Sequence, residues 1–242
     1  MSSLRSLNRP VDLLGHSFPL VAVGLAAATL LLSILSAVAG RGGVGLLALL
    51  PLSPRLVLFG EAWRLVTWPL AERDALSLVF VCLVLLWCGR DLAYAWGPGR
   101  LLAAYFGVAA AAGALTTLVG FLAWPAVLDG FYLAPWAMGD ALIVAWASLF
   151  PHRPILFMFV VRLAGRQIVW ATLGLVTLMA LLDGPARYVP HFLAMGAMWL
   201  YVQGESPRTL WLRLRFRLLD LRRRRARSHL RPVDRPGDRW RH

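Results

Sequence analysis

The sequence predicts an all-α integral membrane protein with six transmembrane helices. Of its 242 residues, 59% are hydrophobic, and the long apolar stretches are separated by loops that contain arginine. A bilayer core is about 30 Å thick, so a spanning helix needs roughly 17–25 residues, and a helix satisfies its own backbone hydrogen bonds in lipid. Six stretches fit, three of them only by extending into polar flanks: residues 19–39, 75–88, 101–128, 131–150, 168–182 and 188–202.

The first stretch is expected to stay in the protein as a helix. Residues 19–39 carry no charge, are longer than the apolar core of a signal peptide and lack a convincing cleavage site. We therefore divide the chain into a cytoplasmic lead at residues 1–18, a six-helix domain at 19–203 and a basic cytoplasmic tail at 204–242.

The loop after the first helix is too long for a simple connection and too apolar for a solvated one. It covers residues 40–74, and its short apolar segments are interrupted by Pro51 and Pro54. Such a segment is expected to lie half embedded at the membrane interface. The chain at residues 152–167, which precedes the fifth helix, is similar in character.

The third and fourth helices carry two further signals. Ala103, Gly107 and Ala111 recur at a spacing of four, which predicts a close helix–helix contact on that face. Asp140 is the only charge in the fourth helix, and an ionisable residue within a span usually faces the bundle interior. Its depth, about two and a half helical turns from the outer end, allows contact with His191 on the sixth helix.

The arginines predict the orientation of the chain in the membrane. The net charge is +13, every basic residue other than histidine is arginine, and the tail from residue 204 carries most of the excess. Because cytoplasmic loops accumulate positive charge, both termini are predicted to be cytoplasmic, which requires an even number of spans. The exclusive use of arginine fits a GC-rich bacterial coding bias, and the bacterial inner membrane is the predicted location.

The tail is predicted to begin as a basic amphipathic helix. Trp211 lies on its apolar face, whereas Arg213 and Arg217 lie on the opposite face. Such a helix next to a span lies along anionic lipid. Docking to an acidic protein or to ribosomal RNA is the alternative, but no stacking aromatic residues interrupt the arginine run, so nucleic acid is not expected as a partner.

Several motifs resemble the rhomboid family in their order and separation. The loop contains E-A-W-R-L-V-T at residues 61–67, which includes Trp63 and Arg64, and the second helix ends in G-R-D-L-A-Y-A-W-G at residues 89–97. The resemblance covers residues 17–205. It implies a rhomboid-like six-helix bundle with a half-embedded first loop, and an intramembrane protease in which a serine on the fourth helix is activated by a histidine on the sixth.

The chain departs from the catalytic pattern of that family. The position of the nucleophile falls on Met138 or on Trp136, depending on the alignment, and only His191 remains of the catalytic set. Ser148, the one serine of the fourth helix, lies near the opposite end from His191, at depths that differ by roughly 15–20 Å. Base activation requires hydrogen-bond contact, so we expect no serine catalysis.

The sequence therefore suggests a rhomboid-like pseudoprotease that binds or scaffolds transmembrane segments of partner proteins between its second and fifth helices, as a subunit of a membrane assembly in one version. Candidate contact residues are Trp63, Arg64, Trp136 and Asp140. The alternatives are a divergent rhomboid intramembrane serine protease, and a proton or metal carrier that uses Asp140 and His191. No cofactor is expected, and two ligands alone do not make a metal site.

Overall fold

The computed structural model describes residues 10–13, 16–41, 49–157 and 161–204. The chain divides into two compact units, Met1–Gln203 and Gly204–His242. All helices and strands of the described residues lie in the first unit. The tail helix expected after residue 204, with Trp211, Arg213 and Arg217, lies outside the described residues.

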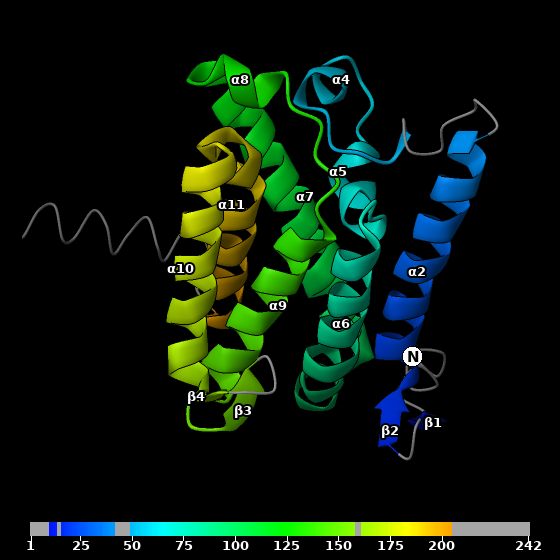
Figure 1. Cartoon of the computed structure of the whole chain (residues 1–242), viewed down its shortest axis with the longest axis vertical. Helices are drawn as coiled ribbons and strands as arrows, with labels where there is room; N and C mark the ends of the chain where they lie inside the picture. The colour runs from blue at the N-terminus through cyan, green and yellow to red at the C-terminus, as the bar shows by residue number, and fades with distance from the viewer. Residues whose placement is uncertain (1–9, 14–15, 42–48, 158–160, 205–242) are drawn as a thin grey trace, which may run out of the picture. The chain divides into compact units, whose positions relative to one another are not determined.

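Long helices make up most of the described chain (Figure 1). They are α2 (Leu20–Arg41), α6 (Ala75–Trp96), α7 (Pro98–Leu122), α9 (Pro135–Leu149), α10 (Gly165–Asp183) and α11 (Pro185–Val202). Shorter helices stand at one end of this bundle: α4 (Pro54–Leu58), α5 (Arg64–Thr67), η1 (Trp68–Leu70) and α8 (Pro125–Leu128).

Within the described residues, four helices are long and apolar enough to cross a bilayer: α2, α6, α7 and α10. This confirms an all-α integral membrane protein. The count of six spans is not confirmed, because it depends on α9 and α11, which do not meet the same criteria. The 15 residues of α9 rise only about 22 Å.

Two small antiparallel hairpins are exceptions to the predicted all-α class. One pairs β1 (Pro10–Leu13) with β2 (His16–Pro19) just before α2. The other pairs β3 (Pro154–Phe157) with β4 (Val161–Ala164) between α9 and α10, within the connection that was predicted to be an apolar interfacial stretch. Hydropathy does not distinguish these short apolar strands from interfacial segments.

Glycine–proline pairs set two of the helix boundaries. Gly97 separates α6 from α7 with a φ of 84°, and Gly184 separates α10 from α11 with a φ of 97°. Glycine adopts this left-handed region without a steric penalty. Pro98 and Pro185 then begin the next helices, where the missing proline N–H costs no helical hydrogen bond. The sequence therefore produces two sharp reversals without an intervening loop.

The loop between α2 and α6 packs onto the bundle through buried apolar residues. Leu52 and Trp68 are completely buried, and the Trp68 indole N–H lies 3.2 Å from the carbonyl oxygen of Ala109 on α7. Leu52 forms a two-way backbone bridge with Tyr132, which lies in the connection between α8 and α9. The loop is thus part of the folded core at that end of the bundle.

Helix α9 lies at the centre of the packing. It contacts α11 most extensively and also packs against α6 and α10, whereas α2 packs mainly against α6. In Figure 1, α9 crosses the middle of the bundle between α10 and α6. At the end of α6, Asp91 accepts hydrogen bonds from Trp146 of α9 and from Arg153 beside β3, each at 2.8 Å. This carboxylate therefore joins three elements.

The prediction that Ala103, Gly107 and Ala111 of α7 form a close contact with another helix is wrong for the described chain. Ala103, Gly107 and Ala111 are exposed in the described chain, whereas the adjacent positions Ala104 and Ala112 are completely buried. The residues that follow one position later point about 100° further around a helix. Since α7 has small residues on both faces, their spacing did not identify the face that packs.

Candidate functional site

The most distinctive site in the described chain is a buried carboxylate–imidazole pair. Asp140 on α9 and His191 on α11 lie 2.8 Å apart, measured from the carboxylate Oδ2 to the ring Nδ1. Their side chains are only 8% and 11% exposed, respectively. The structure thus brings together the two residues that the sequence placed at compatible depths, because α9 and α11 form the most extensive helix–helix contact of the bundle.

Further polar groups lie around this pair, and sequence reasoning did not find them. The Tyr188 ring stands 5.2 Å from the His191 ring between centroids, and its hydroxyl donates to Asp183 at 2.9 Å. Glu72, in the loop before α6, is close enough to His191 for an electrostatic interaction, and its backbone N–H donates to Ser33 of α2 at 2.9 Å. No periodic signal links a loop glutamate to these helices.

Burial is the main influence on the carboxyl group of Glu72. Burial raises the pKa of its carboxyl above the ordinary value, while hydrogen bonds from the backbone N–H groups of Arg73 and Asp74 and the nearby imidazole of His191 act in the opposite direction. A partly buried carboxyl thus lies near the interior carboxylate–imidazole pair.

The positions expected for a lost nucleophile hold apolar side chains. Met138 is completely buried, and Trp136 is partly buried against Phe80 of α6, with ring centroids 6.4 Å apart. Ser148 donates its hydroxyl to the carbonyl of Val144 at 2.7 Å, one turn earlier in α9. Among the hydrogen bonds of the described residues, none joins a hydroxyl or thiol to Asp140 or His191.

The other predicted contact residues, Trp63 and Arg64, lie in the loop before α6 and not at the polar pair. Arg64 is buried; its guanidinium Nε–H donates to Glu61 at 2.5 Å, and Nη1 donates to the carbonyl of Pro51 at 2.8 Å. The Trp63 indole N–H donates to the carbonyl of Leu49 at 3.3 Å, while half of the side chain stays exposed. Both residues therefore form hydrogen bonds within the loop.

Asp140 and His191 are two possible metal ligands. In the part of the chain that the structure describes, they do not belong to a group of three or more His, Cys, Asp or Glu side chains that could hold a metal ion. Structural zinc needs four ligands, and catalytic zinc usually keeps three. A carboxyl and an imidazole at this distance can share a proton through their hydrogen bond.

The helical fold and the apolar spans around this polar pair define an integral membrane protein. Residues 23–203 match the family described as "Eukaryotic integral membrane protein (DUF1751)", and the chain belongs to this family. The comparison with curated proteins found no match.

Two predictions are wrong in the light of this family. The resemblance to rhomboids does not hold, because the matching family is a different one. The motifs that suggested it are explained by local structure, since Trp63 and Arg64 bond within their own loop and Gly97 forms a helix reversal. The bacterial inner membrane is also wrong, because the family consists of eukaryotic membrane proteins. The exclusive use of arginine was therefore no guide to the organism.

Proposed function

We propose that this protein binds transmembrane segments of partner proteins on one face of α9 and does no covalent chemistry on them. The observation that carries this proposal is a partly buried strip on α9, which its neighbours α6 and α10 flank but cover only in part.

The strip follows from the burial pattern of α9. Trp136 and Ile143 are partly buried, and so is Phe150 directly after the helix; the three are spaced by seven residues, which places them on one side. Most other side chains of α9 are buried. Helices α6 and α10 pack on opposite sides of α9 and have no extensive contact with each other. A partner helix packing there would cover an apolar strip that this chain buries only in part.

The absence of chemistry is supported by how the described hydroxyls are used. Ser33, Thr116 and Thr117, like Ser148, donate to backbone carbonyls four residues earlier in their own helices. A serine nucleophile needs a base within hydrogen-bond reach, and among the described residues no serine or threonine hydroxyl is bonded to the imidazole of His191. These contacts favour a binding role for the bundle.

Site-specific photo-crosslinking in native membranes tests the proposal. A photoreactive residue replacing Ile143 or Trp136 should give the same discrete protein adduct. Mass spectrometry should map the adduct to an apolar segment of the partner long enough to span a bilayer. The control position is Leu178 on α10, whose side chain is 51% exposed. Adducts with lipid only, or the same protein adduct from Leu178, would contradict the proposal.

A proton carrier is the second candidate, favoured by the burial of Asp140 and His191 at hydrogen-bond distance, with Glu72 nearby. Ionisable groups inside a membrane protein are costly and often form proton relays. Under this alternative, reconstituted protein dissipates a pH gradient across liposomes, and Asp140→Asn abolishes that flux. If the unaltered protein shows no flux above empty liposomes, the alternative is wrong.

A further inference from the structure

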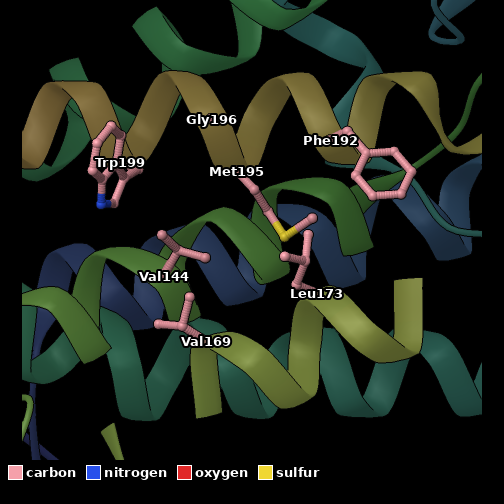
Figure 2. A pocket seen from close by; sticks show the side chains of 7 residues that line it. All are labelled: Val144, Val169, Leu173, Phe192, Met195, Gly196 and Trp199. Atoms are coloured by element: carbon pink, nitrogen blue, oxygen red, sulfur yellow. The ribbon is translucent and has the colours of Figure 1, made fainter. Parts of the chain in front are cut away.

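A second surface of α9 forms the floor of an apolar groove shared with α10 and α11. The groove has a volume of about 220 Å³. Figure 2 shows side chains from the three helices pointing into it: Val144, Val169, Leu173, Phe192, Met195 and Trp199, with Gly196 in the wall. It lies on a different side of α9 from the strip of the proposed function.

The groove is closed at its floor and open at one edge. Val144 and Met195 are buried, at 4% and 6% exposed, whereas Trp199 is 47% exposed. Gly196 is exposed, and a Cβ built on it would meet no atom within 4 Å, so this residue leaves room in the groove. Because α10 is apolar enough to span the bilayer, we expect the open edge to face the hydrocarbon of the membrane.

The size and chemistry of the groove select a hydrocarbon chain as its occupant. Apart from the indole nitrogen of Trp199, its lining side chains offer no polar atom that would hold a polar ligand. A packed helix is about 10 Å across and would not enter a space of this volume, whereas a single acyl chain is narrow and flexible.

A positive charge stands beyond one end of the groove. Arg166 precedes Val169 by three residues on α10 and therefore lies on the same helix face, one turn nearer the helix start. Its side chain is exposed and has no hydrogen bond or ion pair within the described ranges. Trp199 and Val169 lie at the same end of the groove (Figure 2). Tryptophan and arginine together are typical of the headgroup level of a bilayer.

We propose that this groove is a binding site for one anionic phospholipid. One acyl chain lies along Val144, Leu173 and Met195, and the headgroup phosphate pairs with the guanidinium of Arg166. Arginine binds phosphate through parallel N–H donors, and an anionic headgroup adds attraction that a zwitterionic one lacks.

The test uses the full chain, purified in a mild detergent, stripped of lipid and titrated with dioleoylphosphatidylglycerol or dioleoylphosphatidylcholine under native mass spectrometry. The unaltered protein should bind one phosphatidylglycerol several-fold more tightly than phosphatidylcholine. Gly196→Leu, which fills the groove, should weaken binding of both lipids at least tenfold. Arg166→Gln should remove the preference for phosphatidylglycerol while keeping a bound lipid.

The matched control is Gly107→Leu on α7, another exposed helical glycine whose Cβ would meet nothing within 4 Å. It should leave lipid binding unchanged, and thermal unfolding shows whether each variant is folded. Equal binding by the unaltered chain and a folded Gly196→Leu variant overturns the proposal, as does a lipid preference that survives Arg166→Gln. Displacement of the lipid by inorganic phosphate alone also overturns it. So does the finding that the unaltered protein is a dimer and that Gly196→Leu dissociates it into monomers.

Discussion

A proline within α11 is compensated by a tyrosine from outside the helix. Pro190 has no N–H, so the carbonyl of Ala186, four residues earlier, lacks its usual helical partner. The hydroxyl of Tyr132 lies 3.2 Å from that carbonyl and 3.1 Å from the carbonyl of Val127. Val127 also accepts a hydrogen bond from the N–H of Gly130, so Ala186 depends more strongly on the tyrosine.

Tyr132→Phe is therefore expected to destabilise the fold in a way that depends on the proline. The substitution keeps the buried ring, since Tyr132 is only 6% exposed, but it leaves the Ala186 carbonyl without its donor. An unsatisfied buried polar group costs about 1–3 kcal/mol. Because the bond from Tyr132 to Ala186 is only partly buried, we expect a loss in the lower part of that range, about 1–2 kcal/mol, in the free energy of unfolding. In a Pro190→Ala background, the restored N–H bonds the same carbonyl, so the loss should fall below about 1 kcal/mol.

The measurement is a double-mutant cycle of reversible unfolding in detergent micelles, followed by tryptophan fluorescence. Tyr94→Phe, at a half-exposed tyrosine of α6, is the control and should change stability little. A coupling energy of about 1 kcal/mol or more between Tyr132 and Pro190 is expected for groups that share a partner. An equal cost of Tyr132→Phe in both backgrounds would refute the reasoning.

Four further predictions concern the loop before α6. Trp68→Phe should lower the unfolding free energy by about 1–3 kcal/mol, because a buried indole donor is lost; the same denaturation assay would contradict this by showing no change. Arg64→Met should cost about 2 kcal/mol or more, and a cycle with Glu61→Met should be non-additive by at least about 0.5 kcal/mol. Burial raises the pKa of Glu72, so the folded protein holds this proton more tightly than the unfolded chain does. The melting temperature should therefore fall as pH rises above 4.5, and Glu72→Gln should remove that trend. The hydrogen bond from the N–H of Ser77 lowers the pKa of Asp74, so the contribution of this carboxylate to stability should be lost as pH falls below 3.8. Melting curves of Asp74→Asn from about pH 3 to about pH 7 should lack that loss.

The sequence predicted those parts of the fold that depend on periodicity and on rare residues. Apolar length located the long helices, although α6 continues past Arg90 and Asp91 to Trp96, because these charges lie near the membrane edge. Asp140 and His191 were paired correctly, since ionisable residues are few in the spans and tend to meet inside the bundle.

Other contacts depended on rotation and on distant backbone, which sequence spacing does not encode. The small residues of α7 lie on both faces, so the buried face at Ala104 was missed. Glu72 reaches the polar pair only because η1 packs against α9 and α2. The hydrogen bond of Tyr132 to Ala186 joins residues 54 positions apart, and the only signal that could have pointed to it was Pro190 within a helical pattern.

The short length of α9 has a consequence for the order in which the chain assembles. The connection between α8 and α9 is non-helical and carries buried Tyr132 and Ala134, so its backbone groups need partners that lipid does not supply. Leu52 provides two of them, at 2.9 and 2.8 Å, and it is translated well before Tyr132. We therefore expect the amino-terminal half to be in place first, so that Leu52 can pair with Tyr132 when the later helices pack. A circular permutant that began at α8 would enter the membrane with that stretch of backbone unpaired, because Leu52 would then follow Tyr132 in the chain.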